Sequence, residues 1–219
     1  MMKKKGFTLA EVLITLAIIG VVATLTLPSL MTNTQEQQAL TAFKKIMNSL
    51  NEAGQMNAAM EGFDYSSADG FGETSDSIAN GDQTIAALIN ERLQVTGSSG
   101  ESFGKCENSF VLRDATAICL DGEFNEGGRS TIYVDTNGPK GPNKESTCNS
   151  DSTCQDKTQR EIYDQFRVTL FRGIAEPGWD VSGKQKNESD EAYQKRIAEA
   201  DGYNAAANYA MGTSKRSNN

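Results

Sequence analysis

Residues 3–20 read Lys-Lys-Lys-Gly-Phe-Thr-Leu-Ala-Glu-Val-Leu-Ile-Thr-Leu-Ala-Ile-Ile-Gly, and this stretch decides the fold. Three lysines precede an apolar run, and the 24 residues from Val12 to Gln35 carry no charged side chain. As an α-helix these residues would extend roughly 36 Å, enough to cross a hydrocarbon core about 30 Å thick. Because basic residues stay on the cytoplasmic side, the lysines place the N-terminus inside and the remaining chain outside. The stretch therefore predicts a single membrane-spanning helix.

The rest of the chain is acidic and polar. Its 219 residues include 21 Lys and Arg against 29 Asp and Glu, for a net charge of −8, and no histidine. A nucleic-acid binder would show a basic footprint, so no direct contact with nucleic acid is expected. Without histidine the chain lacks the commonest general base and metal ligand. Of the 25 residues from 7 to 31, 17 are apolar, so the remainder predicts one small, loop-rich head.

The apolar run is either a cleaved secretory signal peptide or a retained helix. Its exit reads Leu-Thr-Leu-Pro-Ser over residues 25–29, without the small-x-small site of a secretory signal, which favours the retained helix. Glu11 lies inside the run with no basic neighbour on its helix face. A carboxylate within a membrane costs at least ~2.5 kcal/mol and is by default functional, unless Glu11 lies in the headgroup zone near the lysines.

These residues resemble the class III signal sequence of type IV pilins and type II secretion pseudopilins. The resemblance covers residues 3 to about 30. It implies that a prepilin peptidase cleaves between Gly6 and Phe7 and N-methylates Phe7. Glu11 matches the family's glutamate, fifth in the mature chain, and Pro28 matches its helix-kinking proline.

The resemblance also implies a role for Glu11 in assembly. After cleavage, Phe7 carries a cationic amine that Glu11 of a neighbouring subunit can neutralise. Two charges left unpaired in an apolar filament core would be very unfavourable, whereas the pair sets the register between subunits. Cleavage also removes Lys3, Lys4 and Lys5, which changes the net charge from −8 to −11. The implied partners are this or related pilins and pseudopilins, the prepilin peptidase, and an assembly platform in the inner membrane.

Helical periodicity continues beyond the membrane segment. Apolar or small residues recur at spacings of three and four, and the stripe consists of Leu40, Phe43, Ile46, Met47, Leu50, Ala53, Gly54 and Ala58. The pattern predicts that one helix runs from about Thr8 to Met60, with a membrane half and an amphipathic half. Such a helix would be roughly 80 Å long, and Pro28 would bend it. We expect the stripe to pack against a sheet.

The head is predicted to be an α+β unit. Residues 61–82 indicate a loop, and Asp82 or Thr84 can cap a short helix that ends near Leu93, with 97–100 terminating that element. Four strands are predicted, at 109–113, 117–120, 131–135 and 165–171, as an antiparallel meander on the long helix, the pilin-like architecture. The expected segments are a leader at 1–6, a transmembrane and assembly helix at 7–31, its amphipathic half at 32–60, the head at 61–180 and a polar C-terminal extension at 181–219. Within that extension, 191–200 could form a charged helix and 203–211 a short packed segment.

Four cysteines, Cys106, Cys119, Cys148 and Cys154, allow three disulfide connectivities. A head outside the cytoplasm lies in a compartment that can favour disulfides. The pairs Cys106–Cys119, across a hairpin, and Cys148–Cys154, closing a small loop, are favoured. Zinc is disfavoured because there is no Cys-x₂-Cys pair and no histidine.

Calcium is the alternative to a head without cofactors. The Asp-Thr-Asn-Gly turn at 135–138 and the Pro-Asn pair at 142–143 resemble a strand-exit motif common in pseudopilin heads. Some pseudopilin heads bind calcium in the loop before the last strand. Asp135, Asp151 and Asp156 are oxygen ligands of the type calcium prefers. Their spacing does not form an EF-hand, and aspartates are common in turns.

The favoured function is that of a structural, filament-forming subunit of the cytoplasmic membrane, without enzymatic activity. The alternatives are a membrane-tethered enzyme, a membrane-anchored binding or adhesion module, and a competence pseudopilin for DNA uptake. The enzyme is disfavoured because no histidine and no nucleophile–base pair is present. The residues do not separate a pilus from a secretion or competence filament.

Overall fold

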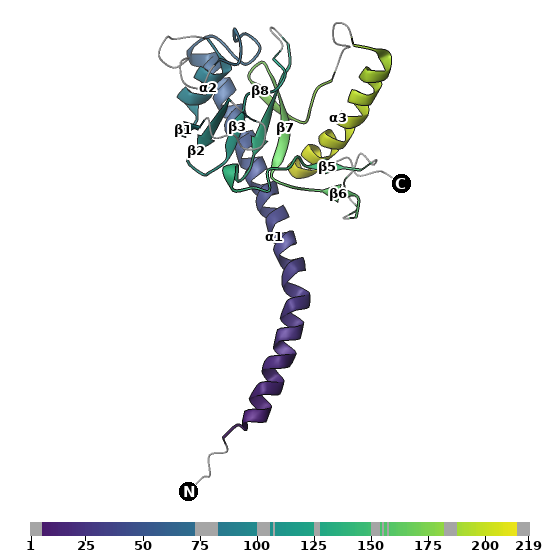
Figure 1. The fold of residues 1–219 in the computed structure, drawn as a ribbon. Coiled ribbons are helices and arrows are strands. Elements are labelled where there is room, and N and C mark those ends of the chain that lie inside the picture. Colours follow the sequence, from purple (N-terminus) through teal and green to yellow (C-terminus); the bar gives the residue numbers. More distant parts are fainter. Residues whose placement is uncertain are drawn as a thin grey trace. The chain divides into compact units, whose positions relative to one another are not determined.

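The computed structural model describes residues 6–72, 83–99, 106, 108–124, 128–149, 154, 156, 158–181 and 188–213, except for the side chains at 28, 29, 98, 99 and 139 (Figure 1). It divides into two compact units, Met1–Gln38 and Ala39–Asn219, and the second is the head. The chain is α+β: a long N-terminal helix, a small antiparallel sheet and a C-terminal helix, as the sequence predicts.

Helix α1 spans Leu9–Met60, which confirms the single helix expected from about Thr8 to Met60. The helix continues without interruption through Pro28. Threonines in the N-terminal half donate their hydroxyl protons back to the helix, from Thr15 to the Val12 carbonyl (2.9 Å) and from Thr24 to the Val21 carbonyl (2.8 Å). Each hydroxyl is thereby satisfied within the helix, which an apolar solvent requires.

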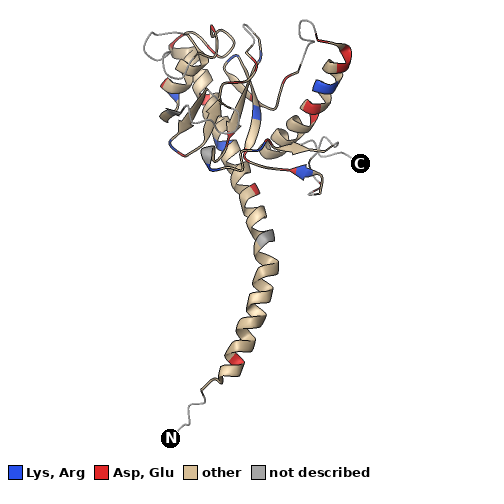
Figure 2. Cartoon of the chain, in the orientation of Figure 1, with Lys and Arg blue, Asp and Glu red and all other residues tan. Residues whose placement is uncertain are grey.

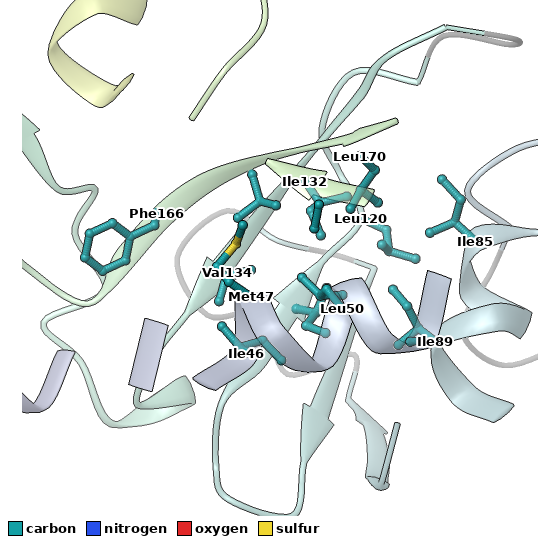
Figure 3. Packing of buried hydrophobic residues seen from close by; sticks show 14 of the residues in the cluster. Ile46, Met47, Leu50, Ile85, Ile89, Leu120, Ile132, Val134, Phe166 and Leu170 are labelled. Atoms are coloured by element: carbon teal, nitrogen blue, oxygen red, sulfur yellow. The ribbon is translucent and has the colours of Figure 1, made fainter. Parts of the chain in front are cut away.

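The apolar stripe of α1 forms the floor of the head's core. Phe43, Met47 and Leu50 are at most 1% exposed, and the Phe43 ring stacks on Phe166 with centroids 4.3 Å apart. Figure 3 shows the side chains of α1 converging with those of the sheet and of the short helix α2. The stripe ends sooner than predicted. Ala58 is exposed, and the buried neighbour is Asn57, whose amide donates to the Phe63 carbonyl (3.0 Å).

A six-stranded antiparallel sheet lies on this helix, in the order β1-β2-β3-β4-β7-β8. Its strands are β1 (Val95–Ser99), β2 (Ser109–Leu112), β3 (Ala117–Cys119), β4 (Ser130–Asp135), β7 (Gln165–Phe171) and β8 (Ile174–Pro177). The four predicted strands are β2, β3, β4 and β7. A separate pair, β5 (Thr147–Cys148) and β6 (Arg160–Glu161), is inserted between β4 and β7, and a 3₁₀ turn at Gly138–Lys140 follows β4.

The two outermost strands are the ones that the sequence analysis missed. The expectation that 97–100 ends the helical element was wrong, because Val95–Ser99 pairs antiparallel with β2. Gly and Ser have low strand propensity, and pairing overrides that preference here. Strand β8 was missed because it is short and ends in proline, a residue that sheets tolerate at an edge.

Helix α1 covers the open edge of β8. The Ala175 N–H donates to Asn51 Oδ1 (2.8 Å), and the Asn51 amide donates to the Ala175 carbonyl (3.3 Å), so that one side chain replaces a neighbouring strand. Gly54 allows this close approach. A Cβ at that position would lie 2.5 Å from the Tyr65 ring and 2.8 Å from the Gly173 carbonyl oxygen. Such a covered edge is protected from pairing with other chains.

Helix α2 spans Ile85–Arg92 and begins as predicted. Thr84 is its N-cap, accepting a hydrogen bond from the Ala87 N–H (3.2 Å), and the alternative cap Asp82 lies outside the described residues. The preceding loop is more tightly packed than expected over residues 61–72. Tyr65 is fully buried, and its hydroxyl donates to the Leu50 carbonyl (2.7 Å).

Helix α3 spans Asp190–Met211, so the division into a helix at 191–200 and a separate segment at 203–211 was wrong. Ser189 caps its start, and Gly212 ends it with a left-handed φ of 75°. Gly202, where the break was expected, is a contact point instead. A Cβ there would lie 2.7 Å from Thr147 Oγ1. The buried side chains of α3 are alanines, at 200, 205, 206, 207 and 210.

Arg167 on β7 anchors α3 to the sheet. Its guanidinium lies 4.1 Å from the ring centroid of Trp179 and 4.0 Å from that of Tyr203, which belongs to α3. Tyr133 on β4 provides a third ring at 5.3 Å. The Arg167 Nη2 also donates to both carboxylate oxygens of Glu145 (3.2 and 3.0 Å). Stacking on aromatic rings together with a carboxylate partner suits arginine in particular.

Candidate processing and assembly site

The residues at the predicted cleavage point precede the helix. Gly6, Phe7 and Thr8 are non-helical and exposed, and Phe7 is 90% exposed. Helix α1 begins at the next residue, Leu9. The Gly6–Phe7 bond therefore lies in accessible, irregular backbone, the kind that proteases cleave most readily.

Glu11 and Thr8 form a reciprocal cap at the start of α1. The Thr8 N–H and the Thr8 hydroxyl each donate to Glu11 Oε2 at 2.8 Å, and the Glu11 N–H donates to Thr8 Oγ1 at 3.3 Å. This is the capping box, in which two backbone donors that the helix leaves free are satisfied by side chains. Both bonds to the carboxylate use Oε2. Among the described residues no hydrogen bond to Oε1 is formed, so this oxygen can accept from a further donor.

Thr8 is a site residue that the sequence analysis did not single out. The pattern Thr-Leu-Ala-Glu over residues 8–11, immediately before an apolar run, is the sequence signature of a capping box. Of the two capping residues, the resemblance drew attention only to Glu11. The pattern of the two residues together would have identified Thr8.

The first unit presents apolar side chains on all sides. Large hydrophobic residues from Phe7 to Met31 are between 46% and 90% exposed, and Glu11 and Glu36 are the only charged residues between 9 and 38 (Figure 2). Helix α1 is the one helix among the described residues that is long and apolar enough to cross a membrane, by length and composition. A helix that is apolar all round is buried in a membrane or in an assembly. The Pro28 kink stays a prediction.

The four cysteines of the head form two disulfides. Cys106 bonds to Cys119 on β3, with Cα atoms 5.9 Å apart, and Cys148 on β5 bonds to Cys154, with Cα atoms 5.7 Å apart. This is the connectivity that the sequence analysis favoured. The second disulfide packs against Ala205 and Ala206 of α3.

Two of the three aspartates considered for calcium serve structural roles in the described residues. Buried Asp135 accepts from the Asn137 N–H (3.1 Å) and from the Gln165 side-chain amide (3.1 Å), and burial raises its pKa to about 6. Exposed Asp156 accepts from the N–H and the hydroxyl of Thr158, and these hydrogen bonds lower its pKa. Asp151 lies outside the described residues.

Neither Asp135 nor Asp156 belongs to a cluster of three acidic or cysteine side chains in the described part of the chain. Within the described ranges, the side chains close enough to hold a metal ion are Cys106, Cys119 and Asp121. Their two sulfurs are bonded to each other and so cannot act as thiolate ligands. Calcium binding at Asp135, Asp151 and Asp156 stays a prediction.

Comparison with known proteins identifies the N-terminal segment. Residues 1–27 match the prokaryotic N-terminal methylation motif, the prepilin-type signature of type IV pilins and pseudopilins. No curated protein and no solved structure matches the chain. The match includes the Gly6–Phe7 bond and the Thr8–Glu11 cap, so the chain carries the signature on the residues whose geometry is described above.

Proposed function

We propose that this chain is a structural subunit of a filament of the type IV pilus or type II secretion pseudopilus class. The observation that carries the proposal is the methylation motif at residues 1–27, located on a helix whose apolar side chains are exposed. Proteins with this signature are structural subunits. The proposal therefore assigns the chain an assembly role and no catalytic one.

Cleavage creates the N-terminal amine that assembly uses. In this proposal a prepilin peptidase cleaves between Gly6 and Phe7, removes the lysine leader and N-methylates Phe7. The new amine is then one residue from Thr8, next to the cap that Glu11 makes. A cation and an anion are thereby fixed at the same end of α1.

Glu11 has a partner before and after assembly. In the membrane, Thr8 satisfies the carboxylate through Oε2, which lowers the penalty of placing Glu11 in an apolar segment. In the filament, the Phe7 amine of a neighbouring subunit would bind the same carboxylate, for which Oε1 remains available. The exposed apolar side chains between 7 and 31 would pack against other subunits in place of lipid.

The proposed location is the cytoplasmic membrane, crossed once by the N-terminal half of α1, with the head outside the cytoplasm. Two observations support this orientation. The leader carries three lysines, which stay in the cytoplasm, and the head contains two disulfides, which persist in oxidising compartments. The proposed partners are copies of this chain, related pilins or pseudopilins, the prepilin peptidase and an inner-membrane assembly platform.

Replacing Gly6 is expected to block processing. With Gly6→Ala, the chain should stay at its full length in the membrane and build no filaments, because no free amine forms at Phe7. The measurement is the electrophoretic mobility of the chain in cells with and without the peptidase, with electron microscopy for filaments. A matched control is Gly20→Ala, a glycine within α1 at which, as at Gly6, an added Cβ meets no atom within 4 Å. Efficient cleavage of Gly6→Ala, or filaments built from uncleaved chain, would contradict the proposal.

A further inference from the structure

Strand β7 and helix α1 run in the same direction through the head. Phe166, near the start of β7, stacks on Phe43 of α1. Gly173, beyond the end of β7, lies against Gly54, where an added Cβ would come within 2.8 Å of the Gly173 carbonyl oxygen. The head therefore has an entry end beside Phe43, where α1 passes into it at Ala39, and a far end beside Gly54.

Five exposed basic side chains lie at the entry end. Lys44 and Lys45 belong to α1, and Arg113 follows β2 in the β2–β3 turn. Lys140 ends the 3₁₀ turn after β4, and Lys144 lies between that turn and β5. Together these five residues form the basic pole of the head.

Contacts between distant segments hold the basic pole together. Lys45 Nζ bonds to Asp114 Oδ2 at 2.6 Å, which fixes the β2–β3 turn beside α1. The 3₁₀ turn packs against the same β2–β3 turn, because a Cβ at Gly138 would lie 2.5 Å from one of its carbonyl oxygens. Asp164, just before β7, accepts from the Lys144 N–H at 2.9 Å. The fold thus brings cations from three segments to one end of the head.

Most of the positive charge of the basic pole lacks a carboxylate partner among the described residues. Lys45 pairs with Asp114, whereas the other four cations form no ion pair with a described carboxylate. Lys144 lies 5.2 Å from the ring centroid of Tyr163, a contact that leaves its charge uncompensated.

Three further carboxylates at the entry end are buried or paired. Asp135 and Asp164 are 0% and 3% exposed and accept hydrogen bonds from backbone N–H groups. Glu145 accepts twice from the Arg167 guanidinium. The exposed charge at the entry end is therefore mainly positive.

The rest of the head is acidic. From Ala39 onward the sequence has 27 acidic and 18 basic side chains, and five of the basic ones belong to the basic pole. At the far end, Arg92 pairs with Glu61 at 2.8 Å, and Arg129 pairs with two carboxylates. The head thus has a positive entry end and a negative remainder.

The entry end is the part of the head that the chain keeps closest to the membrane segment. Lys44 follows Met31, the end of the apolar run, by 13 residues, which as a helix extend roughly 20 Å. The headgroup zone takes up roughly 6 Å of this length. An exposed charge acts over a further ~8 Å at physiological salt, and lysine side chains are long and flexible. The headgroups therefore lie within reach of the basic pole.

We propose that the basic pole binds anionic phospholipid headgroups of the membrane in which α1 is anchored. The inference rests on the proposed function, which places the head at that membrane, and it adds a surface of the head to the membrane contact. The contact holds the head of an unassembled subunit against the membrane, and repulsion turns its acidic remainder away. Each basic side chain at an anionic surface strengthens such binding roughly fivefold.

Lipid headgroups fit the basic pole better than a second copy of the chain does. The acidic remainder of another copy carries a complementary charge, but it reaches the pole only after the two copies meet. Headgroups, in contrast, surround the helix of every anchored subunit and are present at high effective concentration. Lysine ammonium groups act as mobile point charges, which suits phosphates that have no fixed position.

Energy transfer from Trp179, the single tryptophan, to dansyl-labelled headgroups tests the contact. The full chain would be reconstituted into vesicles of phosphatidylcholine alone and of an equal mixture with phosphatidylglycerol, with the same lipids in both leaflets. Transfer should be higher in the mixed vesicles and should fall to the phosphatidylcholine value in high salt. Equal transfer in the two kinds of vesicle would overturn the inference.

Paired substitutions identify the surface that binds. Lys140→Gln with Lys144→Gln should lower the ratio of bound to free heads in the mixed vesicles roughly thirtyfold. Arg172→Gln with Lys195→Gln removes the same charge from exposed positions outside the basic pole and should leave the ratio nearly unchanged. Equal effects of the two pairs would contradict the proposed surface. Transfer that falls when the chain is diluted with the same lipids would assign the pole to a second copy and overturn the inference.

The N-terminus of the chain in cells tests the proposed function separately. A chain that begins at Phe7 and shows no preference for phosphatidylglycerol vesicles would keep the filament role and overturn the lipid contact. A chain that stays uncleaved would contradict the proposed function. The vesicle comparison still decides the lipid contact in that case, because the same helix anchors the uncleaved chain.

Discussion

A chain carrying Glu11→Ala is expected to reach the membrane in normal amount, to be cleaved, and to build no filaments. The cleaved chain would carry a cationic Phe7 amine with no carboxylate to meet it in the filament core. An unpaired ion in an apolar environment is destabilised by several kcal/mol, and one such ion would be present in every subunit. The measurement is the number of filaments by electron microscopy, with the amount of chain in the membrane followed by immunoblot.

Two further variants separate the charge of Glu11 from its capping role. Glu11→Gln keeps an oxygen that can accept from the Thr8 N–H but removes the negative charge, and it should assemble no better than Glu11→Ala. Thr8→Val removes the hydroxyl that caps the helix, which is worth about 1 kcal/mol, and should assemble far better than either. Normal filaments from Glu11→Ala would show that the charge pair is not needed for assembly.

Replacing Arg167 with alanine is expected to destabilise the head by about 3 kcal/mol. The side chain is only 12% exposed, and its removal leaves Glu145 without its partner and removes the surface on which Trp179 and Tyr203 rest. The buried side chains of α3 are alanines, and its other contacts include the hydrogen bonds between Asn204 and Trp179, so the loss is expected to weaken α3 without detaching it. In a chain of this size the change corresponds to a fall in melting temperature of roughly 10 °C.

The measurement is thermal unfolding of the full chain in detergent, followed by circular dichroism. Trp179, the single tryptophan, also reports on α3 through its near-ultraviolet signal. Arg172→Ala is the matched control, since an exposed arginine without a carboxylate partner in the described structure should change stability by no more than ~0.5 kcal/mol. Equal melting temperatures for the two variants would show that Arg167 does not hold α3.

Local patterns in the sequence predicted the parts of the fold that rest on local physics. The apolar stripe with spacings of three and four identified the helix ending at Met60, because a buried helix face repeats at that period. Alternating and β-branched residues identified the four central strands. Thr84 was a correct cap because a threonine before an apolar turn satisfies a free backbone N–H.

The parts that were missed depend on contacts between distant residues. Strand β1 is composed largely of Gly, Ser and Thr and exists because β2 lies beside it. The edge of β8 is completed by the amide of Asn51, more than a hundred residues away in the sequence. Helix α3 was expected as two segments, 191–200 and 203–211, whereas Gly202 between them lacks a side chain and so allows the continuous helix to approach Thr147. No local pattern contains these pairings.

The residues of the candidate site all belong to patterns that are local in the sequence. Gly6, Phe7 and Glu11 were found through a motif that is contiguous in the sequence, and Thr8 belongs to an equally local pattern that the sequence analysis did not use.

The most direct test of the central claim is the mass of the native N-terminus. The chain would be isolated from membranes of cells that contain the prepilin peptidase, digested, and its N-terminal peptide sequenced by mass spectrometry. The proposed function predicts that the peptide begins at Phe7 and carries one methyl group on its α-amine. A chain that begins at Met1, or one that begins near Ser29 as after cleavage of a secretory signal, would contradict it.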